Sequence, residues 1–397
     1  MSNTIQWIWL TKAISMNSKK ISYLLDEYGD IDSIYNSTTY NGDYLTAKDK
    51  NNLADKSLME AANVYKAVCN CGAFILTYDN PHYPECLKAI DDIPYVLYLK
   101  GKPIDLDNIL GIGVVGTRNN TKYGEQCATM LASELGKRGA VIISGMALGI
   151  DCIAMHAAIK TGARTIGVLG CGIDMIYPST NKWLFEETLK NGLIISEYPP
   201  ETMATRYTFP QRNRIIAALS KGVLVIEGAA KSGSMITAKY AEKYGRELFA
   251  LPRNIGDKND EGILMDGTNE LIKNGAHIIT SADDIVERYY QYEIKLNMTE
   301  EIKNLPEYED VPKSKSKAQP EEHKEEAAKP DITELLARTD DDKEKSVMKL
   351  IAEESLYPDE IAMDLDGGAG DIGVILTIME TKGLIKRQPD GRYGLSL

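Results

Sequence analysis

Residues 109–151 read ILGIGVVGTRNNTKYGEQCATMLASELGKRGAVIISGMALGID, in which two short apolar runs flank a helical segment. The runs cover 109–115 and 140–144, and each opens into a loop of glycine and small polar residues. Continuous apolar runs of this length, alternating with helices, are typical of strands buried on both faces of a parallel sheet. Since ligands bind such sheets at the carboxyl ends of the strands, the loops after these runs are the candidate binding segments.

The same alternation continues towards residue 280. Further apolar runs, each followed by a turn or a helical segment, lie at 165–169, 193–196, 223–227, 247–251 and 276–280. Repeated βαβ units with right-handed crossovers are therefore predicted, which gives an α/β fold with helices on both faces of a parallel sheet. We assign this domain to residues 76–292.

A small helical domain is predicted before the sheet, at residues 1–75, where apolar residues recur at helical spacing. Within it, LLDEYGDIDSIY (24–35) is similar to the turn of a SAM or helix-hairpin-helix domain, with Gly29 free to take a positive φ. A purely structural role and direct DNA contact are both open for this domain.

The C-terminal part of the chain predicts a linker and a third domain. Residues 293–340 are rich in Glu, Lys and Pro and poor in large apolar residues, which predicts a flexible linker. Residues 341–397 show three helical patterns and then two short strands about an Asp-Gly turn, the order of a winged helix. Its basic residues cluster towards the wing, at Lys382, Lys386, Arg387 and Arg392. We expect this domain to contact protein or to be structural rather than to read DNA sequence.

Composition excludes several classes of protein. Hydrophobic residues make up 43% of the chain, enough for a sizeable core, and no apolar run is long enough to cross a membrane. The six cysteines include no CxxC pair and the four histidines are far apart, so no metal site or cofactor is predicted, and a reducing cytoplasm is expected. The formal net charge is -13, yet residues 107–280 hold about 19 basic and about 17 acidic residues. Acidic charge therefore lies mainly on the flanks and leaves room for a basic surface between them.

The loop after the first apolar run suits an anionic ligand. GTRNNTKYG (116–124) offers Gly116 for close backbone approach, the Thr117 hydroxyl and the Arg118 guanidinium, ahead of a helix N-terminus. Its glycines do not match the dinucleotide fingerprint, because they lie within the strand rather than after it. A structural role for Arg118 is as open as a binding role.

The loop after the second run, SGMALGID (144–151), is built from small residues. Ser144, Gly145 and Gly149 let the chain turn tightly and expose backbone donors. Asp151 is either the cap of the following helix or a catalytic acid.

Arginines and aromatic rings occur together in SEYPPETMATRYTFPQRNRIIAALS (196–220). They are Arg206, Tyr207, Phe209, Arg212 and Arg214. Single-stranded nucleic acid requires this combination, because phosphates accept charge-assisted hydrogen bonds and bases stack on rings. The alternative is a bracing network that takes up Arg212 or Arg214.

A second anion-binding loop follows the run at 223–227. Glu227 ends that run, and GAAKSGSMITA (228–238) places Lys231, Ser232, Gly233 and Ser234 at a helix N-terminus. The loop does not satisfy the Walker A pattern. Two phosphate-binding loops in one domain favour a phosphodiester or nucleotide ligand over a simple metabolite.

The ordered motifs VVGTRNNTKYG, SGMALGID, VLGCGID, SEYPP, FPQRNRIIAALS and SGSMITA closely resemble the DprA/Smf family over about residues 75–290. The resemblance implies an extended Rossmann-like domain that binds single-stranded DNA, forms a homodimer and helps load RecA in natural transformation or recombination. It also implies a helical N-terminal module and, in many members, a C-terminal winged helix. No catalytic residue and no membrane association are expected.

Carried over by position, the resemblance assigns DNA binding to all four loops. The expected site comprises Gly116, Thr117, Arg118, Ser144, Gly145, Gly149, Lys182, Phe209, Arg212, Asn213, Arg214, Lys231, Ser232, Gly233 and Ser234. Three positions depart from the family pattern. Ser179 replaces a basic residue, whose role either falls to Lys182 or is lost. Met155 replaces a histidine, with His156 displaced by one, and Arg253 replaces a glycine.

The competing hypothesis is an enzyme of the same fold type, similar to nucleotide phosphoribohydrolases, with Glu227 as its acid. Those enzymes carry a PGGxGTxxE motif, whereas this chain reads GAAKSGSMITA and places no second carboxylate for acid–base work. A purely structural or adaptor protein is the third hypothesis, and it leaves the two anion-binding loops without a purpose.

Overall fold

The computed structural model describes residues 2–289, 339, 341–353, 361, 369–387 and 393–395. Residues up to Tyr289 belong to one compact unit, and the described C-terminal residues form a second unit with its own core. Among the described helices, none is both long and apolar enough to span a membrane. The predicted linker at 293–340 falls almost entirely outside the described residues.

A nine-stranded sheet runs through the first unit, in the order β1-β2-β6-β5-β4-β3-β7-β8-β9. The strands from β6 to β9 in this order are parallel, and all of them are the strands predicted from the apolar runs. They are β3 (Gly111–Gly116), β4 (Val141–Ser144), β5 (Thr165–Leu169), β6 (Leu193–Ser196), β7 (Gly222–Glu227), β8 (Glu247–Ala250) and β9 (His277–Ile278). The chain leaves β3 towards β4 on one side and returns to β7 on the other. The switch point of the sheet therefore lies between β3 and β7, where ligands bind in open α/β sheets.

Two further strands extend the sheet, and neither was predicted. β1 (Phe74–Thr77) pairs antiparallel with β2 (Val96–Gly101), and β2 pairs antiparallel with β6. The sheet is therefore mostly, not wholly, parallel.

Each face of the sheet carries its own hydrophobic core. Side chains alternate between the faces, so that Ile112 and Val114 of β3 enter one core and Val115 enters the other. The first core also holds α7 (Lys122–Lys137), α8 (Ile150–Lys160), α9 (Lys182–Asn191) and α13 (Asp283–Val286). The second holds α6 (Glu85–Lys88), α10 (Thr208–Leu219) and α11 (Gly233–Lys243), with Leu271 of α12 (Gly267–Lys273) packed against it. Both faces are thus covered by helices, as predicted.

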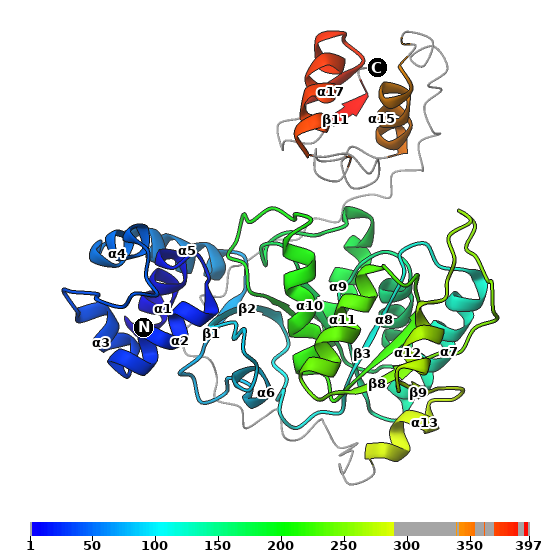
Figure 1. The fold of residues 1–397 in the computed structure, drawn as a ribbon, viewed down its shortest axis with the longest axis horizontal. Coiled ribbons are helices and arrows are strands. Elements are labelled where there is room, and N and C mark those ends of the chain that lie inside the picture. Colours follow the sequence, from blue (N-terminus) through cyan, green and yellow to red (C-terminus); the bar gives the residue numbers. More distant parts are fainter. Residues whose placement is uncertain are drawn as a thin grey trace. The chain divides into compact units, whose positions relative to one another are not determined.

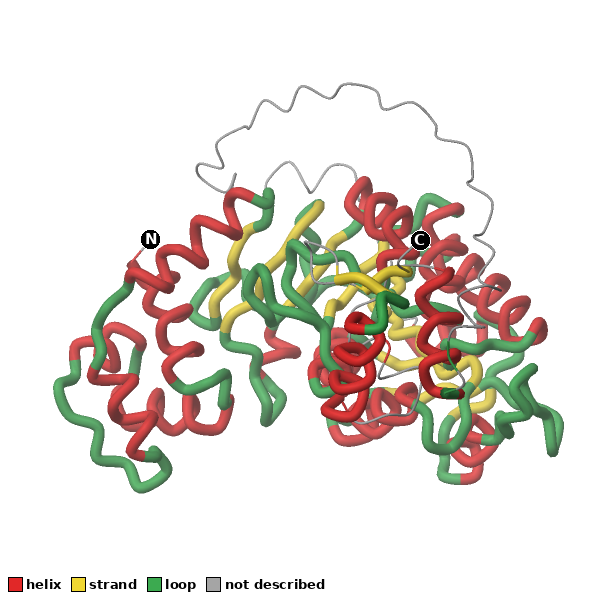
Figure 2. Tube along the Cα trace, turned by 90° about the horizontal axis from the view of Figure 1, so that it is seen from above, coloured by secondary structure: helices red, strands yellow, loops and turns green. Residues whose placement is uncertain are grey.

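The N-terminal residues form the predicted helices, and both views place them at one end of the sheet (Figures 1 and 2). They are α1 (Ser2–Ala13), α2 (Ser18–Tyr28), α3 (Ile31–Asn36), α4 (Ala47–Ala54) and α5 (Met59–Asn70). Gly29 takes a φ of 90° between α2 and α3, which confirms the predicted turn. Trp7 of α1 stacks on Tyr95 at a centroid distance of 5.7 Å, and it belongs to the same core as α7 and α8.

The described C-terminal residues agree with the predicted winged helix. α15 (Asp342–Glu353) and α17 (Ala369–Thr381) are followed by β10 (Ile385–Arg387) and β11 (Tyr393–Leu395), which pair antiparallel. Val347, Met348 and Leu376 are among the buried residues that form this small core. The second predicted helix, at 358–365, lies almost entirely outside the described residues.

Candidate functional site at the carboxyl edge of the sheet

The Arg118 guanidinium lies free at the carboxyl end of β3, beside the switch point. The residue is exposed, and within residues 2–289 it has no ion pair or hydrogen bond from its side chain. Its Cζ atom lies 5.5 Å from the ring centroid of Phe209, a cation–π contact. Arg118 therefore does not brace Glu227 or Asp151, and its donors are available to a ligand.

Phe209, in the first turn of α10, is fixed by its neighbours. A Cβ atom added at Gly170 would lie 2.8 Å from the Phe209 ring, so the ring rests against the chain just after β5. The Tyr177 ring also packs against it, at a centroid distance of 5.1 Å. The ring is half-buried, which leaves part of it at the surface beside Arg118.

Arg212 supports the loop after β4 from inside the protein. It is buried and donates to the backbone carbonyls of Gly145, at 2.6 Å, and Val168. Gly145 N in turn donates to the buried carboxylate of Asp151 at 3.0 Å. Burial lowers the pKa of Arg212 to about 10, although the nearby Asp151 charge opposes this shift. Burial also raises the pKa of Asp151, against the opposing effect of Arg212. Asp151 thus orders the loop rather than capping α8.

The same loop packs directly on the backbone of Thr117 and Arg118. Gly149 has a φ of 73°, and a Cβ atom there would lie 2.4 Å from the Thr117 carbonyl oxygen. Ile150 N donates to that oxygen at 3.2 Å. Position 149 therefore requires glycine for two reasons, the positive φ and the close approach of the Thr117 carbonyl oxygen.

Arg214 and Asn213, also on α10, have partners within the protein. Arg214 Nη2 donates to both carboxylate oxygens of Glu197, at 2.6 and 2.5 Å, and both side chains are buried. Asn213 Nδ2 donates to the Gly233 carbonyl at 3.2 Å and so joins α10 to the start of α11. The alternative role considered for Arg212 or Arg214, a structural one within the protein, therefore applies to both residues.

The remaining predicted residues are less constrained. Lys231 precedes α11 and Lys182 is the first residue of α9, and both are exposed. Ser232 and Ser234 contact each other through their hydroxyls at 2.7 Å, and Ser232 makes no side-chain cap to α11. Ser144 is fully buried and its hydroxyl donates to the Val114 carbonyl at 2.6 Å, so its side chain serves the sheet.

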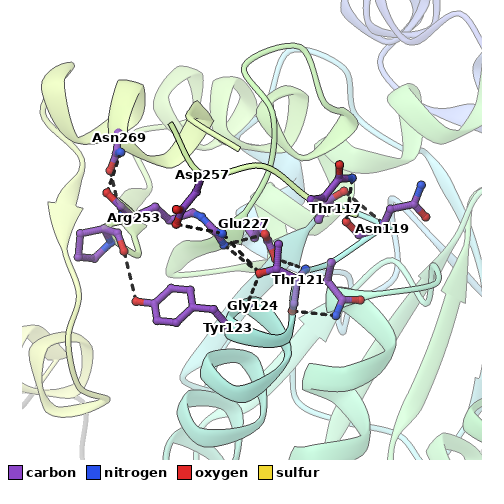
Figure 3. Close-up of polar contacts among 12 residues, drawn as sticks. Thr117, Asn119, Thr121, Tyr123, Gly124, Glu227, Arg253, Asp257 and Asn269 are labelled. Atoms are coloured by element: carbon purple, nitrogen blue, oxygen red, sulfur yellow. Dashed lines mark hydrogen bonds and ion pairs between the residues drawn. The ribbon is translucent and has the colours of Figure 1, made fainter. Parts of the chain in front are cut away.

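Sequence reasoning missed the role of Arg253 (Figure 3). Its Nη1 atom lies 2.7 Å from Oε1 of Glu227, and the two side chains are 2% and 0% exposed. The Glu227 carboxylate, the candidate acid of the enzyme hypothesis, is therefore inaccessible to solvent, and its charge is paired with that of Arg253. The replacement of a glycine by Arg253 was visible in the sequence, but nothing there indicated its partner. Within the described residues, no three His, Cys, Asp or Glu side chains gather to hold a metal ion.

Comparisons with known proteins agree with this architecture. The family model for DNA recombination-mediator protein A matches residues 74–290, and the model for the DprA winged helix domain matches 326–391. Protein Smf of Synechocystis is 36% identical over 330 residues, which cover 80% of this chain and 79% of that protein. DNA processing protein DprA of Bacillus subtilis is 44% identical over 216 residues, which cover 54% of this chain and 71% of that protein.

Solved structures of DNA processing protein A are also similar. That of Streptococcus pneumoniae has a TM-score of 0.62 at 30% identity and covers 72% of this chain and 97% of its own. That of Helicobacter pylori, described for its single-stranded DNA binding mode, has a TM-score of 0.49 at 38% identity and covers 55% of this chain and 96% of its own. The family models, the curated relatives and the Streptococcus pneumoniae structure all identify this chain as a member of the DNA recombination-mediator protein A (DprA/Smf) family, whose role lies in DNA processing.

Proposed function

We propose that the protein binds single-stranded DNA at the carboxyl edge of its sheet and acts there as a recombination mediator. The observation that carries the proposal is the free, exposed guanidinium of Arg118 lying over the half-buried ring of Phe209. A guanidinium donates two parallel hydrogen bonds to a phosphate, and aromatic rings and guanidinium planes both stack on bases of any kind. The pair therefore suits a single strand of any sequence.

The other predicted residues divide into two groups in this proposal. Lys231, Lys182 and the backbone of Ser232 to Ser234 supply further contacts to phosphates, because they are exposed or lie at the open start of α11. Arg212, Asn213 and Arg214 hold the loops and helices that carry the contacts, because their side chains already have partners.

Fluorescence anisotropy with labelled oligonucleotides tests DNA binding. We expect the protein to bind single strands of unrelated sequence more tightly than the matching duplex, with affinity that falls as salt rises. Each phosphate contact on a single strand contributes about 0.7 to the slope of log K against log salt. Equal affinity for the duplex, or a slope of zero, would show that the proposal is wrong.

RecA loading and homodimer formation in the cytoplasm complete the proposed function, and they rest on the family resemblance. We expect the protein to sediment as a dimer and to shorten the lag before RecA filaments form on protein-coated single strands. If the protein sediments as a monomer and does not shorten the lag, although it binds DNA, its function is DNA binding without RecA loading.

A further inference from the structure

Glu227, at the end of β7, holds both ends of the loop that carries Arg118. We call residues 117–121 the Arg118 loop. At its start, Thr117 N donates to the Glu227 carbonyl oxygen at 2.8 Å. At its end, Thr121 N donates to Oε2 of the Glu227 side chain at 3.0 Å (Figure 3). One residue thus fixes the two ends, and Arg118 projects from between them.

The approach of the Glu227 carboxylate to α7 is unusually close. A Cβ atom added at Gly124 would lie 1.8 Å from Oε2 of Glu227. Thr121 caps α7, since its hydroxyl accepts from Gly124 N at 3.1 Å. A fully buried carboxylate in this position needs a countercharge, because burying an unpaired ion costs several kcal/mol.

Arg253 supplies that countercharge and also contacts the Arg118 loop. Its Nη1 atom pairs with Glu227 at 2.7 Å, and both Nη atoms lie 3.4 Å from the Thr121 hydroxyl. The planar guanidinium therefore joins the carboxylate and the end of the loop at once. Nη2 of Arg253 also lies 3.5 Å from Asp257 Oδ2, whereas Nε is buried without a hydrogen bond.

The segment after β8 fixes Arg253 in turn. Arg253 N donates to Asn269 Oδ1 at 3.1 Å, and Asn269 Nδ2 donates to the Arg253 carbonyl at 3.0 Å. The guanidinium lies 5.3 Å from the ring centroid of Tyr123, whose hydroxyl donates to the Pro252 carbonyl at 3.3 Å. Further along, Asn119 Nδ2 donates to the Glu261 carboxylate at 2.7 Å, so the segment contacts the Arg118 loop at a second point.

We propose that Arg253 is a positioning residue for DNA binding: its ion pair with Glu227 and its contact with Thr121 hold the Arg118 loop in the conformation that presents Arg118 to a phosphate. This inference rests on the proposed function, since it assigns Arg253 a role in the same site. The Arg253 side chain is 2% exposed, so its proposed role is to act through the loop and not to contact DNA itself.

The test is a double-mutant cycle on the full chain, with Arg118→Ala, Arg253→Met and both together, read by anisotropy with a labelled oligothymidylate. Arg253→Met should lower the affinity by about tenfold, the lower end of the range for one lost charge-assisted contact. It should also make the slope of log K against log salt shallower by about 0.7, the same change that we expect for Arg118→Ala. In the Arg118→Ala background, Arg253→Met should change the affinity by less than about twofold, because the contact that it supports is already gone.

Two controls separate positioning from stability. Arg164 is a partly buried arginine at the amino end of β5, the opposite edge, where it donates to the Pro103 carbonyl at 2.7 Å. Arg164→Met should leave the affinity and the salt slope unchanged, whatever it does to the melting temperature. If Arg253→Met does not fold, Glu227→Gln with Arg253→Met removes both buried charges together, which is close to neutral for stability. That protein should fold and still show the lower salt slope.

The failures are distinguishable. If Arg118→Ala leaves the affinity unchanged, the proposed DNA site is wrong and this inference falls with it. If Arg118→Ala weakens binding but folded Arg253→Met, or the double variant that replaces it, binds with the wild-type affinity and slope, only the role of Arg253 is overturned. Fully additive effects of the two substitutions would also overturn it.

Discussion

Arg118→Ala should weaken binding of single-stranded DNA by about ten- to a hundredfold, which corresponds to roughly 1.5–3 kcal/mol for one charge-assisted contact. The melting temperature should change little, because Arg118 is exposed and within residues 2–289 its side chain loses no ion pair or hydrogen bond, only a cation–π contact of about 0.5–1 kcal/mol. Anisotropy titrations and thermal melts on the same preparations measure both quantities.

Two further substitutions make this result specific. Arg118→Lys should recover only part of the affinity, because lysine keeps the charge but not the planar fork. Lys137→Ala removes an equal charge from the last turn of α7, and it should change the affinity little. An equal loss for Lys137→Ala would mean that net charge, not the site, controls binding. Unchanged affinity in folded Arg118→Ala would remove the strongest reason for placing DNA at the end of β3.

Glu227→Ala should destabilise the protein by about 3–5 kcal/mol, the cost of leaving one partner of a buried ion pair alone. The substitution leaves the buried Arg253 guanidinium with only the partly exposed Asp257 carboxylate, 3.5 Å from its Nη2 atom, and it removes the acceptor of Thr121 N. Chemical denaturation monitored by circular dichroism measures the change in the free energy of unfolding.

The same substitution separates a structural carboxylate from a catalytic one. Removing a catalytic acid usually leaves stability unchanged, whereas removing this carboxylate should lower it strongly. Glu227→Gln keeps the acceptor for Thr121 N and should be the milder of the two changes. A Glu227→Ala protein as stable as the wild type would contradict the structural role, and loss of a nucleotide-hydrolase activity in that protein would favour the enzyme hypothesis.

The parallel strands were predictable because each is buried on both faces. A strand such as β5 (Thr165–Leu169) is buried throughout, so it appears in the sequence as a short, continuous apolar run. β1 (Phe74–Thr77) and β2 (Val96–Gly101) were missed for a different reason. β1 has only four residues, and its membership of the sheet depends on pairing with β2 about 20 residues later.

Within the site, the sequence indicated which loops meet but not which side chains point outwards. Arg118 follows a strand directly, so the rule for strand ends placed it correctly at the carboxyl edge. Arg212 and Arg214 lie two residues apart on one helix, and both side chains are buried. Burial of a charge depends on partners elsewhere in the chain, here the Gly145 carbonyl and Glu197. Neither partner is visible in a local pattern.

Anchoring both ends of the Arg118 loop on Glu227 has a thermodynamic consequence for association. Restricting the backbone of one residue costs about 1–2 kcal/mol of conformational entropy at room temperature. The hydrogen bonds at Thr117 and Thr121 already restrict the backbone of Arg118, Asn119 and Asn120 in the folded protein. Most of this entropy is therefore lost on folding and not on binding. If DNA binds at the proposed site, it therefore meets a preorganised loop, and little of the free energy gained at its phosphates is lost in ordering the protein.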